Sequence, residues 1–159
     1  MFSPAETRLL LTDPMKHSSL WEKDSPQRPR FDAFWGENGI ESVHDEAGGW
    51  PHLVQLIAET IVDLINDEDK RIVDNDLFDR ALDKAIVSGH NVLHQLMQGE
   101  SQLPGEWEYL SAFRRHSTQP PPDDENIYRL LRRRLLVTEE GNEWRLRVPL
   151  MERWLKKRG

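Results

Sequence analysis

Residues 126–155 carry the pattern that decides the fold of this chain, NIYRLLRRRLLVTEEGNEWRLRVPLMERWL. Within that stretch, residues 135–139 and 143–148 are two short runs of strand-forming residues on either side of a turn at Gly141. The second run places three apolar side chains on one face with a period of two: Trp144, Leu146 and Val148. The pattern therefore predicts a β-hairpin, followed by a last helix over residues 150–157.

Three helices are predicted before the hairpin. They lie at residues 90–98, at residues 105–116, and from a cap at Asp123 or Asp124 to about Leu136. Three helices followed by a hairpin are the order of elements in a winged helix.

The first part of the chain is also predicted to be helical. Ser3, with Glu6 three residues later, predicts the start of a helix that Pro14 ends. Residues 15–32 are rich in proline, serine and mixed charge, and predict a loop. A weaker helical pattern, interrupted by glycines, covers residues 32–47.

The clearest helix follows a Gly48-Gly49-Trp50-Pro51 turn. Pro51 suits the first position of a helix, where the missing N–H needs no partner. Apolar residues then recur at three- and four-residue spacing to about Asn66. A further helix is expected to begin after a cap at residue 74 or 75 and to end at residues 88–89, and the carboxylates around it predict a solvated acidic face.

These elements predict a mainly α fold with two subdomains. Residues 1–88 form a helical subdomain, and residues 89–159 form a winged-helix subdomain with a small β-hairpin. The charge is divided unevenly, because residues 1–128 hold 11 basic and 24 acidic side chains whereas residues 129–159 hold 10 basic and 4 acidic ones. A basic end of this kind can bind nucleic acid or an acidic partner, or it can dock on an acidic neighbour in the same chain.

The composition indicates a cytoplasmic protein that does not enter the membrane. The chain of 159 residues is 37% hydrophobic and 31% charged, with a net charge of −7 and no cysteine. Disulfides and thiolate chemistry are therefore excluded. No apolar run approaches the roughly 20 residues that a spanning helix needs, and no signal peptide is recognised.

No catalytic residue is predicted. The sequence lacks the phosphate-binding pattern G-x-x-x-x-G-K-[ST] and the patterns G-x-G-x-x-G, G-x-S-x-G and H-E-x-x-H. His90 and His94 are four residues apart, but their spacing alone does not define a metal site, and we expect none. The chain by itself is therefore not expected to be an enzyme.

Several segments resemble a known family. They are TRLLLTDP at residues 7–14, AGGWPHLVQLI at residues 47–57, VDLIN at residues 62–66 and the C-terminal stretch quoted above. In this order they resemble the helical lid and the following winged helix of bacterial STAND-class AAA+ ATPases. The resemblance covers most of residues 1–14 and 45–159.

The resemblance implies a nucleotide contact. In the wider family, the proline of the glycine-x-proline turn packs against the adenine of the bound nucleotide, which assigns that role to Pro51. Gly48, Gly49 and Trp50 would shape the turn. The phosphate-binding lysine and the magnesium-binding acids are expected upstream of Met1, on a P-loop core supplied in cis or in trans. ATP or ADP with Mg would then be bound only together with that core.

One departure from the family concerns the winged helix. Better-studied members carry a histidine and an aspartate after the last strand, and these residues sense ADP. Pro149 and Leu150 stand at those positions here, so direct nucleotide sensing by this winged helix is not expected.

Two other functions remain open from the sequence. The third winged-helix helix carries Arg129, Arg132, Arg133 and Arg134 on or near its exposed side, whereas Tyr128, Leu130, Leu131 and Leu135 are expected to face inward. The arginines would let a winged-helix regulator bind DNA, or they form a solvated basic face. A scaffold that binds a protein effector is the third hypothesis.

Overall fold

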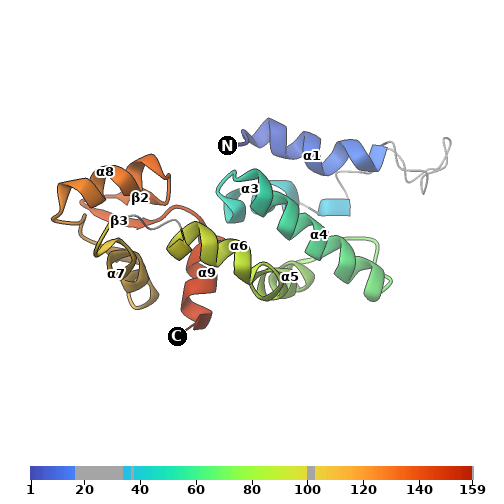
Figure 1. Cartoon of the computed structure of the whole chain (residues 1–159). Coiled ribbons are helices and arrows are strands. Elements are labelled where there is room, and N and C mark those ends of the chain that lie inside the picture. Colours follow the sequence, from blue (N-terminus) through green and yellow to red (C-terminus); the bar gives the residue numbers. More distant parts are fainter. Residues whose placement is uncertain (17–33, 37, 100–102, 159) are drawn as a thin grey trace. The chain divides into compact units, whose positions relative to one another are not determined.

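The computed structural model describes residues 1–16, 34–36, 38–99 and 103–158. The fold is mainly α, with a small antiparallel sheet of three strands (Figure 1). The chain divides into two compact units, Met1–Ala85 and Ile86–Gly159. The division falls inside one helix, slightly before the boundary between residues 88 and 89 that the sequence suggested.

The elements of the first unit are α1 (Pro4–Lys16), α3 (Gly39–Ala47), α4 (Pro51–Asp67) and α5 (Asn75–Ser88), the last of which continues into the second unit. The second unit contains α6 (His90–His94), the π-helical segment η2 (Gln95–Gly99), α7 (Glu106–Ser111), the 3-10 segment η3 (Ala112–Arg114), β1 (Thr118–Gln119), α8 (Glu125–Arg133), β2 (Val137–Glu140), β3 (Glu143–Leu146) and α9 (Pro149–Arg158).

The capping box at the start of α1 is confirmed. The Glu6 backbone N–H donates to Ser3 Oγ at 3.2 Å, and the Ser3 N–H donates to Glu6 Oε1 at 3.3 Å. The predicted end of this helix was wrong, because α1 continues through Pro14 to Lys16. A proline removes one backbone donor, and a helix can continue past that single loss. Most of the predicted loop at residues 15–32 lies outside the described residues.

Helix α3 is shorter than the predicted helix of residues 32–47. It begins at Gly39, after Asn38 in a left-handed conformation. The segment before α3 lies close to the segment before α5, because the Val73 N–H donates to the Phe34 carbonyl at 2.9 Å. Gly36 has φ +78° there, and a Cβ on it would lie 2.6 Å from the Val73 carbonyl oxygen. A helix cannot run through this turn.

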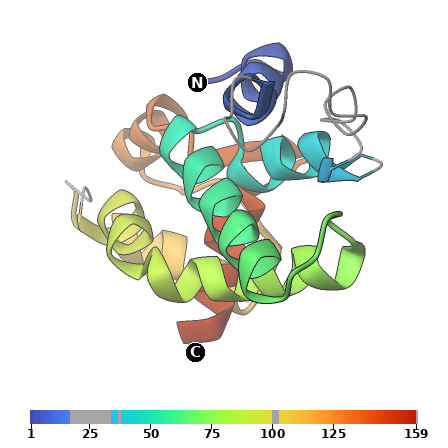
Figure 2. The same ribbon diagram turned by 90° about the vertical axis from the view of Figure 1, so that its right-hand side faces the viewer.

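Helix α4 matches the prediction and forms the centre of the first unit. It begins at Pro51 and packs on α3 and α1 (Figure 2). Its buried face follows the expected spacing: Leu53, Val54, Ile57, Thr60, Ile61 and Ile65. Helix α5 is capped by Asp74, whose Oδ1 accepts the Leu77 N–H at 2.7 Å.

The helices of the second unit are divided more finely than predicted. The segment at residues 90–98 is one α turn, α6, that changes to π geometry in η2. The segment at residues 105–116 is α7, which ends in the 3-10 turn η3. Asp124 caps α8, because its side chain accepts the backbone N–H groups of Asn126 and Ile127.

Helix α8 ends before the predicted Leu136. Arg133 is its last residue, and Leu135 takes φ +59°. The predicted inward position of Leu135 was also wrong, since 42% of its surface is exposed. The first hairpin strand is correspondingly displaced to Val137–Glu140.

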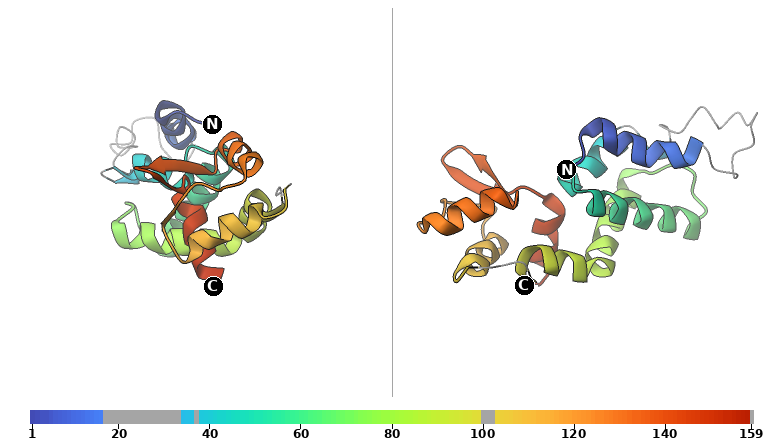
Figure 3. Two further views of the ribbon diagram at one scale, coloured as in Figure 1. Left: turned by 90° about the vertical axis from the view of Figure 1, so that its left-hand side faces the viewer. Right: turned by 45° about the horizontal axis from the view of Figure 1, so that its top comes forward.

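The sheet has the order β1-β3-β2, with both pairs antiparallel. The hairpin of β2 and β3 lies beside α8 and is the wing of the winged helix (Figure 3). The two-residue strand β1 was not predicted, because so short a strand has no periodic signal. The predicted alternation is confirmed, because Trp144, Leu146 and Val148 are all buried, although β3 itself ends at Leu146. No helix among the described residues is long and apolar enough to cross a bilayer.

Candidate functional site

The turn between α3 and α4 is held in a conformation that requires glycine. Gly48 has φ +61° and Gly49 has φ +75°. The Gly49 N–H donates to the His44 carbonyl at 3.1 Å, which closes the end of α3. The Phe2 N–H donates to the Gly49 carbonyl at 2.6 Å, so the chain before α1 is bound to the turn. A Cβ on Gly49 would lie 2.8 Å from the Phe2 carbonyl oxygen.

A side-chain hydrogen bond between α1 and α3 stabilises the same turn. Thr7 is fully buried on α1, and its Oγ1 shares a hydrogen bond of 2.7 Å with Nδ1 of His44 on α3. His44 Cε1 would be 3.3 Å from a Cβ on Gly49. Sequence reasoning missed Phe2, Thr7 and His44, because they meet the turn only when α1 packs on α3.

Trp50 and Pro51 form the accessible part of the turn. Both are half-buried, Trp50 is the N-cap residue of α4, and Pro51 is its first residue. The Trp50 indole Nε1–H is buried and donates to no acceptor among the described residues. An unmet buried donor costs about 1–3 kcal/mol. The turn therefore combines two half-buried apolar side chains with a buried donor that has no acceptor among the described residues.

Three of the four predicted arginines on α8 are exposed. Arg129 pairs with Glu125 at 2.6 Å, and Arg132 pairs with Glu139 of β2 at 3.3 Å. Arg133 is exposed as well. The first two guanidinium groups are thus already partly neutralised by carboxylates of the same unit.

Arg134 was wrongly placed on the exposed side. Only 11% of its side chain is exposed, and it forms a buried ion pair with Glu106 of α7, which has no exposed surface. Arg134 also donates to the Leu96 carbonyl, and the Leu103 N–H donates to Glu106 Oε2 at 3.2 Å. This residue joins η2, α7 and the end of α8, so its guanidinium is engaged within the second unit.

A shallow hollow of about 290 Å³ lies between α8 and the wing. It is lined by Arg132, Val137, Thr138, Glu139 and Trp144. The ring of Tyr128 lies 4.7 Å from that of Trp144, centroid to centroid. Arg132 and Glu139, which line this hollow, pair with each other at 3.3 Å.

Nearby, Tyr109 of α7 fixes the segment before α8. Its hydroxyl donates to the Pro120 carbonyl at 2.7 Å, and burial raises the pKa of the Tyr109 phenol. The phenol therefore stays a neutral hydrogen-bond donor across the physiological range.

His90 and His94 lie on one face of α6, with ring centroids 6.0 Å apart. Trp154 Nε1 donates to His90 Nδ1 at 3.0 Å, so His90 contributes to the packing of α6 on α9. Among the described residues, no group of three or more potential ligands could hold a metal ion.

The geometry defines a helical module with a clamped glycine–proline turn, followed by a winged helix. No family model matches the chain, and neither a curated protein nor a solved structure matches it. The assignment of function therefore depends on the residues of the turn and of the winged helix.

Proposed function

We propose that this chain is a non-catalytic regulatory module of a nucleotide-dependent signalling ATPase. In this role the first unit is the lid of a P-loop core in cis or in trans, and the turn of Gly48, Gly49, Trp50 and Pro51 contacts adenine. The observation that carries the proposal is the clamped turn itself, where Pro51 follows Trp50, whose buried indole N–H has no acceptor among the described residues.

The chemistry of the turn fits an adenine ring. An apolar platform supplies contact area, and few polar groups are needed to orient a flat heterocycle. The ring nitrogens of adenine are acceptors, and the buried Trp50 Nε1–H, which has no acceptor in the described part of the chain, could donate to one of them if the indole turned outward. The phosphates and Mg would be held by the core, because this chain has no phosphate-binding motif.

Because the turn is clamped, nucleotide binding at the turn can be coupled to a change in conformation. Phe2 holds the turn from the chain before α1, and His44 holds it from α3, so a ligand at Pro51 contacts a segment tied to both elements. A nucleotide bound to both lid and core would favour the closed arrangement by its differential affinity. We place this switch in the cytoplasm, with a protein effector as the downstream partner.

The test is a nuclear magnetic resonance titration of the purified chain. Its six tryptophans give resolvable indole N–H signals, and Trp50→Phe assigns that of Trp50. Millimolar ATP or ADP is expected to shift the Trp50 signal, with weak affinity because the core is missing. Pro51→Ala should reduce the shift.

A matched control is available in the same chain. Pro149 also opens a helix, α9, in the second unit, so Pro149→Ala should leave the titration unchanged. A Trp50 signal that does not move at millimolar nucleotide would contradict the adenine contact.

The winged helix supports the DNA-binding alternative less well. Exposed arginines on α8 are the observation in its favour. However, the wing carries Glu139, Glu140 and Glu143, all exposed, beside this helix. Carboxylates at that place repel the phosphates of a duplex docked on α8.

A further inference from the structure

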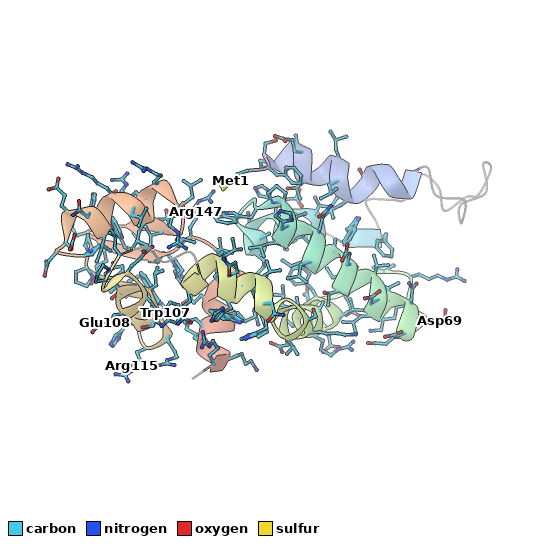
Figure 4. The ribbon with its side chains drawn as sticks, in the orientation of Figure 1. Met1, Asp69, Trp107, Glu108, Arg115 and Arg147 are labelled. Carbon is cyan, nitrogen blue, oxygen red and sulfur yellow. The ribbon has the colours of Figure 1, made fainter. Side chains whose placement is uncertain are left out.

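The second unit has a basic surface away from the α8 helix that the sequence emphasised. Helix α9 packs against η3, which brings the basic last turn of α9 to the basic end of η3. Lys156 Nζ donates to Ser117 Oγ at 3.4 Å and joins the two segments. Figure 4 shows Arg115 projecting away from the ribbon at this end of the unit. We call this the η3–α9 surface: Arg114, Arg115, Lys156, Lys157 and Arg158.

Lys156 of this surface pairs with Glu152 at 3.0 Å, whereas three other cations of the surface have no carboxylate partner among the described residues. Arg114, Arg115 and Lys157 are exposed, and no carboxylate among the described residues pairs with them. On α8, by contrast, Arg129 and Arg132 each pair with a glutamate, and Arg133 is the one exposed arginine without a carboxylate partner among the described residues. A cation without a carboxylate partner does not have to break an ion pair before it binds an anion. The η3–α9 surface therefore attracts a polyanion more strongly than α8 does.

An aromatic group lies within the same surface. The Arg158 guanidinium stacks 5.6 Å from the Trp107 ring centroid and 4.8 Å from that of Trp154. Trp107 is half-buried and Trp154 is buried. Stacking of this kind holds the Arg158 guanidinium in a fixed place. It also places the half-buried Trp107 ring beside the cations of the η3–α9 surface.

We propose that the η3–α9 surface binds the phosphate backbone of nucleic acid. The cations come from two elements and are spread over an open surface, which suits a chain of phosphates better than one small anion. Interleaved basic and aromatic side chains are typical of such surfaces. The acidic wing and the exposed Asp123, Asp124 and Glu125 at the start of α8 direct a polyanion away from the recognition helix.

The experiment measures binding of labelled single-stranded and duplex oligonucleotides to the full chain by fluorescence anisotropy. Arg114, Arg115 and Lys157, the three cations without a carboxylate partner in the described part of the chain, predict a slope of log affinity against log salt of about −2.7 for duplex and about −2.1 for single strands. Between about 50 and 200 mM salt, duplex affinity should thus fall about 40-fold. The two arms show which form of nucleic acid is bound.

The test variant is Arg114→Ala with Arg115→Ala, and its matched control is Arg129→Ala with Arg133→Ala on α8. Removal of two phosphate contacts should reduce the steepness of the slope by about 1.8 for duplex and by about 1.4 for single strands. The control should keep the slope of the unaltered chain. All four side chains are exposed, so both variants should fold, which circular dichroism checks.

Three results would overturn the proposal. The first is no anisotropy change with either oligonucleotide at low salt, and the second is an equal loss in the α8 control. The third is salt-dependent self-association that the Arg114/Arg115 variant abolishes while nucleic acid stays unbound, since the acidic helices of a second copy would then be the ligand.

Discussion

Replacing Glu106 by glutamine is expected to destabilise the second unit severely. Glu106 has no exposed surface, and its partner Arg134 is only 11% exposed. The change leaves a buried guanidinium without its counter-charge and weakens the acceptor of the Leu103 N–H. Breaking a buried pair on one side costs about 3–5 kcal/mol. Since Arg134 keeps the Leu96 carbonyl and reaches some solvent, we expect the lower end, about 3 kcal/mol.

Urea unfolding followed by tryptophan fluorescence measures this loss. Trp107, Trp144 and Trp154 lie in the second unit and report on it. The matched control is Glu125→Gln, which removes the exposed pair with Arg129. An exposed pair four residues apart on a helix contributes about 0.3–0.5 kcal/mol, so this variant should unfold almost as the unaltered chain does.

A double variant separates the cost of an unpaired charge from the value of the pair. Glu106→Leu with Arg134→Met replaces both charges by apolar groups, and replacement of a whole buried pair is often close to neutral. We expect the double variant to be more stable than Glu106→Gln. If Glu106→Gln cost less than about 1 kcal/mol, the pair would not be the buried junction that we describe.

Three further predictions concern other positions. Leu135→Gly should stabilise the second unit by about 1 kcal/mol in urea unfolding, because Leu135 is exposed and held at φ +59°; a loss of stability would contradict this. Gly49→Ala should destabilise the first unit more than Gly141→Ala destabilises the second. Both have positive φ, but only Gly49 has a backbone oxygen within 2.8 Å of the new Cβ; equal losses in thermal unfolding would refute the clamped turn. Acid should weaken the first unit through Glu68 and Asp74. The hydrogen bond from Arg80, and then Lys70, lowers the pKa of Glu68, and the hydrogen bond from the Leu77 N–H lowers that of Asp74. Their stabilisation is therefore present above the ordinary values of 4.5 and 3.8 and is lost as the pH falls below them. The variant Glu68→Gln with Asp74→Asn should lose less stability between neutral pH and about pH 3.

The elements with strong local signals could be predicted from the sequence. Pro51 and the apolar spacing after it predicted α4, and the alternation of Trp144, Leu146 and Val148 predicted β3. The capping box of Ser3 and Glu6 predicted the start of α1. Each of these signals depends on residues that are close in the chain, so no tertiary contact is needed to detect it.

The limits of some elements depended on distant residues. Helix α3 starts late because Gly36 lies against the Val73 carbonyl, far along the chain. Strand β1 exists because Thr118 and Gln119 meet Arg145 and Trp144 of β3. Two residues without a pattern of their own become a strand only when that partner is in place.

The candidate site divides in the same way. The sequence by itself determined the Gly48-to-Pro51 turn, because glycine and proline restrict the backbone locally. Only the tertiary structure decided that Phe2 and His44 clamp that turn, and that the Trp50 indole N–H is buried with no acceptor in the described ranges. The tertiary structure also decided which basic residues can bind a partner's charge. Arg134 forms a buried ion pair with Glu106, whereas Arg114 and Arg115 are exposed and have no carboxylate partner among the described residues. A run of arginines is uniform in sequence, but the charge that each one offers depends on the carboxylates that folding brings beside it.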